Sequence, residues 1–179
     1  NGGQQPAKIG KKELDSIVKL VEKSSQILGI SNAISKGDVV MTKDGPKIIE
    51  IAPRLSGGYF SSDQIPLATG INIIEIAIRL SLGEKINKDK LFFRDQNAVA
   101  IRYFFPKPGK ITSISNIDLF KNKSWVHKLD LFFGVDDVLE KIIDHTKRCG
   151  FVITTGNTRD EAVERAKTVV KNVQILTRQ

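Results

Sequence analysis

Two short strand-like runs separated by a turn signal constrain the fold of this chain most strongly. Residues 36–43 and 46–52 are rich in Val and Ile, and Asp44-Gly45 stands between them. Such a dipeptide between two strand-like runs is typical of a β-hairpin, because glycine readily adopts the positive φ of a tight turn. The sequence therefore predicts an antiparallel hairpin over residues 36–52.

Helical and strand-like patterns surround this hairpin. Helices are expected from Lys11 to Gly29, from Asn72 to Gly83, and after Thr158, which has capping-box spacing with Glu161. Strand-like segments rich in β-branched and aromatic residues are expected over 97–105, 110–114, 125–133 and 151–155. This order lacks a regular βαβ alternation and predicts an α+β fold.

The pattern also divides the chain into two parts. Residues 1–10 are expected to form a disordered or extended lead, and periodicity is lost over the charged residues 84–96. We therefore predict a first domain over residues 1–90, with an antiparallel sheet and covering helices, and a small α+β unit over residues 91–179.

Composition narrows the class of protein. Hydrophobic residues make up 40% and charged residues 27%, with no apolar run long enough to span a membrane and no signal-peptide pattern. The net charge of +8 comes from lysines that are not interleaved with aromatic residues, so nucleic-acid binding is not expected.

The single cysteine, Cys149, is predicted to be a structural thiol and favours a cytoplasmic location. His127 and His145 are read as structural or surface residues. Because no initiator methionine is present, we expect a segment of a longer polypeptide.

Asp38 and Glu50 flank the predicted turn, and the loop length decides how they pair. A loop of two residues, 44 and 45, places Asp38 opposite Ile51, whereas a loop over 43–45 with Gly45 in the left-handed region places Asp38 opposite Glu50. In the second register the two Cβ atoms lie roughly 5 Å apart on one face. Carboxylates that close need a proton or a cation between them, and Mg²⁺ accepts such oxygen ligands. The alternative is a pair of acids that merely solvate an exposed hairpin.

In that register Val40 and Ile48 lie next along the same face. They would give an apolar floor beside the acids, against which the base or ribose of a nucleotide could pack. A metal held beside such a floor suggests a site for a magnesium nucleotide.

The segment after the second acid contains residues suited to anions. Arg54 lies four residues past Glu50 in irregular sequence and can reach a phosphate or a developing oxyanion beside the metal. Gly57 and Gly58 allow close approach of the backbone and present N–H groups to an anion. A glycine-rich turn with a surface arginine is the alternative, and it is weighed equally from these residues alone.

The segment GDVVMTKDGPKIIEIAPRLSGGYFSSDQIPLATG, residues 37–70, resembles the metal-binding strands of the ATP-grasp superfamily. The similarity is greatest to the group of L-amino-acid ligases and phosphoribosylglycinamide synthetase-like proteins. It continues through IPLATGINIIEIAIRLSLGE and CGFVITTGNTRDEAVERAKTVV, which resemble the helix after the loop and the terminal strand and helix. The resemblance implies the fold of an ATP-grasp carboxyl-terminal subdomain followed by a ligase-type unit.

The resemblance also implies residue roles. Asp38 and Glu50 match the acids that bind the magnesium ions of ATP, and Arg54 matches the arginine that contacts the transferred phosphate. Val40 falls where an aliphatic residue packs on the adenine. The loop that receives the carboxylate substrate corresponds to Ser56, Gly57 and Gly58. Many members carry Asn two residues after the glutamate, where this chain has Ala52, so a second magnesium ion would be held more weakly or through water.

The implied function is part of an ATP- and Mg²⁺-dependent ligase, with Mn²⁺ as a possible substitute. It would join a small-molecule carboxylate to an amine or a thiol through an acyl phosphate. The amino-terminal domain and the lid of such enzymes have no counterpart upstream of Gly37, so we expect the isolated chain to be inactive. Two alternatives stay open: a carboxylase or carbamoyl-phosphate-forming enzyme, and a non-catalytic module that binds a nucleotide or a partner. The sequence leaves homodimer formation open.

Overall fold

The computed structural model describes residues 2–87, 91 and 97–178, which form two compact units. The hairpin unit contains the described residues from Ala7 to 91, and the sheet unit contains residues 2–6 together with 97–178. The predicted boundary at 90/91 adjoins residues 88–90 and 92–96, which lie outside the described part of the chain. Residues 2–6 were expected in the first domain, but contacts group them with the second.

The hairpin unit consists of a hairpin and four helical segments. Its elements are α1 (Lys11–Ile27), β2 (Lys36–Thr42), β3 (Gly45–Ala52), the π-helix η1 (Phe60–Gln64), α2 (Ile65–Thr69) and α3 (Ile73–Ser81). The expected hairpin and both expected helices are confirmed. As predicted, Asn72 caps α3 by accepting a hydrogen bond from the Glu75 N–H at 3.2 Å. The segments η1 and α2 were not predicted.

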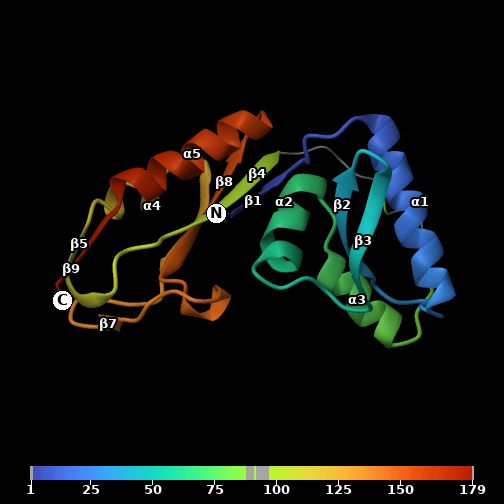
Figure 1. The fold of residues 1–179 in the computed structure, drawn as a ribbon, viewed down its shortest axis with the longest axis horizontal. Helices are drawn as coiled ribbons and strands as arrows, with labels where there is room; N and C mark the ends of the chain where they lie inside the picture. The colour runs from blue at the N-terminus through green and yellow to red at the C-terminus, as the bar shows by residue number, and fades with distance from the viewer. Residues whose placement is uncertain (1, 88–90, 92–96, 179) are drawn as a thin grey trace. The chain divides into compact units, whose positions relative to one another are not determined.

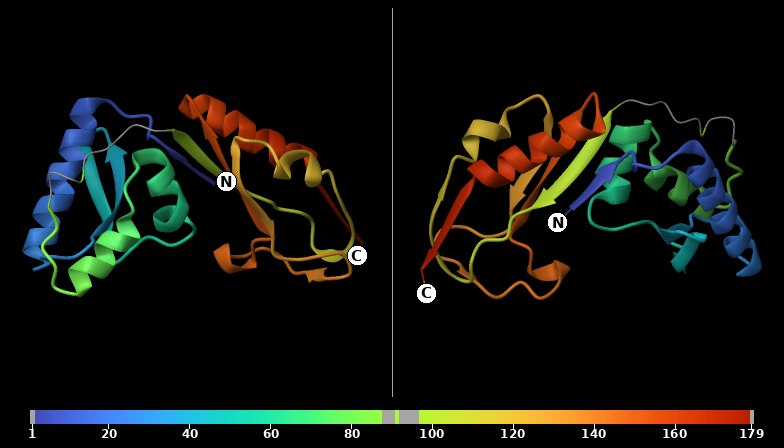
Figure 2. Two further views of the ribbon diagram at one scale, coloured as in Figure 1. Left: turned by 180° about the vertical axis from the view of Figure 1, so that it is seen from behind. Right: turned by 45° about the horizontal axis from the view of Figure 1, so that its top comes forward.

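The hairpin has one face toward α1 and one exposed face. In Figures 1 and 2, α1 lies along one side of β2 and β3. A Cβ placed on Gly37 would lie 3.0 Å from the Val21 side chain of α1. Because side chains alternate along a strand, Val39 and Met41 share this face and are half-buried, whereas Asp38 and Val40 point the other way and are exposed.

The helix α1 covers the hairpin with only part of its apolar pattern. Ile17, Leu20 and Val21 are half-buried, as the helical spacing predicts. Ile27 and Leu28, at the end of the helix, are 75% and 62% exposed. No residue of α1 is fully buried.

The sheet unit has two antiparallel sheets and a long helix. Its elements are β1 (Gly2–Gln5), β4 (Ala98–Tyr103), β5 (Gly109–Ser115), α4 (Asp118–Lys121), β6 (Val126–Leu131), β7 (Val138–Leu139), the 3-10 helix η3 (His145–Lys147), β8 (Gly150–Gly156), α5 (Arg159–Asn172) and β9 (Gln174–Arg178). The strand orders are β1-β4-β8-β6 and β7-β5-β9. The mixed helices and antiparallel sheets of both units confirm the α+β class.

The core of the sheet unit forms where α5 packs on β4 and β8, as Figures 1 and 2 show. Ala162 and Ala166 on α5 and Ala100 on β4 are fully buried, and such small side chains let helix and sheet approach closely. The approach is also close at Gly156, where an added Cβ would lie 2.7 Å from the Ala162 backbone nitrogen. The predicted helix and its cap are confirmed, since Thr158 Oγ1 accepts from the Glu161 N–H.

The amino-terminal residues form an edge strand of the sheet unit. Residues 2–5 pair with β4 in an antiparallel register, so the lead expected to be disordered or extended is extended. Arg102 strengthens this pairing, because its Nη1 donates to the Gly3 carbonyl at 2.9 Å and its Nη2 to Gln4 Oε1 at 2.8 Å.

None of the helices in the described residues is long and apolar enough to cross a membrane.

Cys149 provides a test of the packing of the sheet unit. The side chain is 3% exposed, and burial raises the pKa of its thiol. Because the thiolate is the reactive form, we expect Cys149 of the folded chain to react with an aromatic disulfide reagent at pH 8 about tenfold more slowly, or slower still, than after unfolding in guanidinium chloride. Equal rates in the two conditions would show that β8 and its neighbours do not enclose the thiol.

Candidate functional site

The structure pairs Asp38 with Glu50, which is one of the two registers considered from the sequence. The expected reason for this pairing is wrong. Thr42 pairs with Gly45, so the loop consists of residues 43 and 44 only. The register shifts instead between Asp38 and Val39, because Ile49 on β3 bulges out of the ladder and is 72% exposed. The bulge brings Glu50 onto the same face as Asp38.

The bulge also changes the predicted apolar floor. Val40 pairs with Lys47 and stays on the face of the acids, where it is 44% exposed. Ile48 pairs with Val39 and therefore lies on the face toward α1, so its expected place beside the acids is wrong. A nucleotide on the acid face could contact Val40 but not Ile48.

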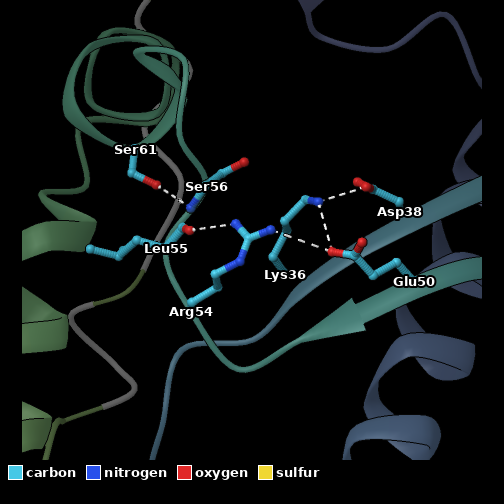
Figure 3. Close-up of polar contacts among 7 residues, drawn as sticks. All are labelled: Lys36, Asp38, Glu50, Arg54, Leu55, Ser56 and Ser61. Carbon is cyan, nitrogen blue, oxygen red and sulfur yellow. Dashed lines mark hydrogen bonds and ion pairs between the residues drawn. The ribbon is translucent and has the colours of Figure 1, made fainter. Parts of the chain in front are cut away.

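Lys36 joins the two acids, and the sequence reasoning did not identify it. Its Nζ donates to Asp38 Oδ2 at 2.6 Å and to Glu50 Oε1 at 3.3 Å. Figure 3 shows the ammonium between the two carboxylates. The hydrogen bond to Asp38, with a smaller contribution from Glu50, raises the pKa of Lys36, although partial desolvation opposes this. Its spacing two residues before Asp38, on the same face of β2, was the available signal.

Arg54 contacts the same oxygen of Glu50 as Lys36 does. Its Nη2 is 3.5 Å from Glu50 Oε1, and its Nη1 donates to the Leu55 carbonyl at 3.1 Å. Figure 3 shows the guanidinium directed toward the acid pair. The Arg54 side chain is 57% exposed, so an anion bound beside the carboxylates could reach it from solvent.

The segment after Arg54 is shaped by hydrogen bonds from the π-helix. The Ser56 N–H donates to Ser61 Oγ at 2.9 Å, and Gln64 Nε2 donates to the Gly58 carbonyl at 3.4 Å. Ser61 and Gln64 are buried, whereas Gly57 and Gly58 are exposed. Single-turn π-helices occur frequently at functional sites. The buried polar residues thus hold an exposed glycine pair in a defined shape, which the sequence did not reveal.

The backbone at the start of η1 is unusual as well. Gly58 and Tyr59 have φ values of +62° and +63°, and such a value is uncommon for a residue with a side chain. These two residues with positive φ turn the chain, and the Phe60 N–H donates a hydrogen bond to the Gly57 carbonyl at 3.2 Å.

The acid pair fits a divalent cation. Both carboxylates reach one ammonium nitrogen, so their oxygens converge on a single point that a cation can occupy. No group of three or more His, Cys, Asp or Glu side chains suited to a metal occurs among the described residues. Mg²⁺ commonly uses one or two carboxylates and completes its shell with water and phosphate oxygens, so two acids suffice. Ala52, which pairs with Lys36 across the strands, adds no oxygen ligand.

The comparison with protein families matches residues 102–178 to the L-amino acid ligase C-terminal domain 2. This match lies within the sheet unit, whereas the acid pair and Arg54 lie in the hairpin unit. Among curated proteins, the uncharacterized protein y4rH of Sinorhizobium fredii (strain NBRC 101917 / NGR234) is 24% identical over 157 residues, which are 88% of this chain and 32% of that protein.

Solved structures of ligases share the fold of both units. The L-amino acid ligase from Bacillus licheniformis has a TM-score of 0.86 at 18% identity, over 98% of this chain and 45% of its own. The phosphoribosylglycinamide synthetase from Anaerococcus prevotii has a TM-score of 0.83 at 17% identity, over 99% and 45%. The chain thus spans less than half the length of either protein.

A carboxylase is similar to a lesser degree. The biotin carboxylase domain of Hydrogenobacter thermophilus 2-oxoglutarate carboxylase, solved with MgADP and bicarbonate, has a TM-score of 0.67 at 14% identity, over 97% of this chain and 38% of its own. Together these findings confirm the predicted resemblance. The chain has the fold of the carboxyl-terminal region of ATP-grasp ligases, and residues 102–178 match an L-amino acid ligase domain.

The shape of the glycine loop depends on Ser61. Replacing Ser61 by Ala removes the acceptor for the Ser56 N–H in a half-buried setting. We expect the loop over 56–58 to open more readily, with amide exchange of Ser56 about tenfold faster by hydrogen–deuterium exchange. Ser62→Ala is the matched control, because Ser62 is exposed and its hydroxyl contacts only Asp63 among the hydrogen bonds described. Equal exchange in both variants would contradict the assignment.

Proposed function

We propose that this chain supplies the metal- and phosphate-binding part of an ATP-dependent ligase that joins a carboxylate to an amine or a thiol. The observation that carries this proposal is the convergence of Asp38 and Glu50 on one point, the Lys36 ammonium, beside Arg54. The ligase fold and the L-amino acid ligase match support it. The chain spans 45% of each of the two ligase structures. That further residues complete the active site is therefore part of this proposal.

The proposed reaction has two steps. An oxygen of the substrate carboxylate bonds to the γ-phosphorus of ATP while the bond from that phosphorus to the β-γ bridging oxygen breaks, which releases ADP and leaves an acyl phosphate. The amine then attacks the acyl carbon, phosphate leaves, and the amine loses a proton. A bound Mg²⁺ offsets the charge of the phosphate oxygens. Mn²⁺ has similar ligand preferences and would substitute.

The residues of the hairpin unit have distinct tasks in this scheme. Asp38 and Glu50 would hold the metal at the point where their oxygens converge, and Arg54 would stabilise the oxygens of the transferred phosphoryl group. Val40 would contact the adenine from the same face. The substrate carboxylate would meet the exposed backbone of Ser56, Gly57 and Gly58.

The two other functions considered from the sequence are less well supported. Bicarbonate could act as the carboxylate in a carboxylase, but the carboxylase domain has a lower TM-score than either ligase, and the family match is to a ligase domain. A non-catalytic binding module would not need Arg54 directed at the acid pair. The ligase therefore accounts for more of the structure.

The metal site is tested by removing one acid at a time. We expect Asp38→Asn and Glu50→Gln each to weaken Mg²⁺-dependent ADP binding by about tenfold or more, since each variant leaves one carboxylate for the metal. Isothermal titration calorimetry with and without Mg²⁺ measures this. Asp44→Asn is the matched control, because Asp44 is an exposed acid in the turn of the same hairpin. Equal ADP affinity in all three variants would contradict the metal assignment.

The role of Arg54 is tested by comparing two nucleotides. We expect Arg54→Met to weaken binding of a non-hydrolysable ATP analogue by about tenfold and to change ADP affinity much less, because the guanidinium is assigned to the transferred phosphate. Arg79→Met is the control, since Arg79 pairs with Glu75 and Glu84 in and after α3. An equal loss for both nucleotides would assign Arg54 to the metal site or to the hairpin instead.

A further inference from the structure

Lys36 is the most enclosed member of the charged cluster. Its side chain is 22% exposed, whereas those of Asp38 and Glu50 are each 49% exposed. Both hydrogen bonds described for its ammonium go to these two acids, at 2.6 and 3.3 Å. The ammonium therefore lies where the oxygens of both carboxylates converge.

A divalent cation would need the same oxygens. A metal bound to both carboxylates would lie within a few ångströms of the ammonium in its present place, and two positive charges at that separation repel each other strongly. The strong hydration of Mg²⁺ in water adds to the cost of displacing an ion already paired with the acids. Metal and ammonium thus compete for a single position.

Among the described residues, Asp38 and Glu50 are the only anions that hydrogen-bond with Lys36. Its cross-strand partner is Ala52, which has no polar side-chain atom. Arg54, which pairs with the same Glu50 oxygen, carries the same sign of charge as Lys36. An ammonium displaced by a metal would therefore turn to solvent or to an anion that arrives with the metal.

We propose that Lys36 makes the site selective for a metal–nucleotide complex over the free metal ion. In the nucleotide-free protein Lys36 occupies the cation position between Asp38 and Glu50. When a divalent cation enters together with a nucleoside phosphate, Lys36 moves to a phosphate oxygen, which a lysine ammonium on a flexible stem binds readily. This inference rests on the proposed metal site.

Two titrations on the 179-residue chain test this exchange. Free Mn²⁺ binding is measured by electron paramagnetic resonance, and binding of the Mn²⁺–ADP complex by calorimetry. For Lys36→Met we expect free Mn²⁺ to bind about tenfold more tightly, because the competitor is gone, and Mn²⁺–ADP about threefold more weakly, because a phosphate contact is lost. In the double variant with Asp38→Asn the gain in Mn²⁺ affinity should disappear.

Lys47→Met is the matched control. Lys47 lies on the same face of the hairpin, opposite Val40, so it carries the same charge change without a contact to the acids. We expect both affinities of this variant to stay within about twofold of the unaltered chain.

Opposite changes in the two affinities of Lys36→Met support the inference, and any other pattern overturns it. A decrease in both affinities would show that Lys36 only orders the hairpin. No change in either affinity would show that Lys36 has no part in binding. If neither the unaltered chain nor Lys36→Met binds Mn²⁺, the metal site itself fails, together with the proposed function. If the unaltered chain binds Mn²⁺ and Lys36→Met binds it equally well, only the inference about Lys36 fails.

Discussion

The pairing of β2 with β3 is the constraint on which the candidate site depends. Side chains alternate between the faces of a strand, so a shift of one residue would turn Glu50 away from Asp38. The two-residue turn alone would produce that shift, and the bulge at Ile49 corrects it. One unpaired residue on an exposed edge of the ladder thus decides whether the two acids meet. The site is therefore built by local backbone geometry within one hairpin.

The sequence predicts the parts of this arrangement that depend on local patterns. Asp44-Gly45 marks the turn and Asn72 marks the start of a helix, because both act through their own neighbours in the chain. The bulge at Ile49 has no local signal, since it reflects how two strands accommodate each other. The edge strand β1 was predicted only as a disordered or extended lead for a related reason: Gly2–Gln5 contains no β-branched residue and becomes a strand by pairing with β4.

The two units differ in how their residues are buried. Every fully buried hydrophobic residue described in the structure belongs to the sheet unit, between Ala98 and Val173. In the hairpin unit the buried residues are Ser61 and Gln64, both polar and both bonded to the backbone of the glycine loop. Burial of polar groups specifies geometry more than it adds stability. The buried residues described in the hairpin unit therefore fix the shape of the glycine loop.

The energetics of the charged cluster fit an exchange of partners better than a role in folding. Ion pairs among half-exposed side chains add little to stability, because water screens the charges and ordering long side chains costs entropy. The hairpin is held instead by its backbone ladder and by the contact of its inner face with α1, through residues such as Val21 and Ile51. Lys36, Asp38, Glu50 and Arg54 all lie away from that contact. Their pairs can therefore break and re-form around a ligand while the strands that position them stay in place.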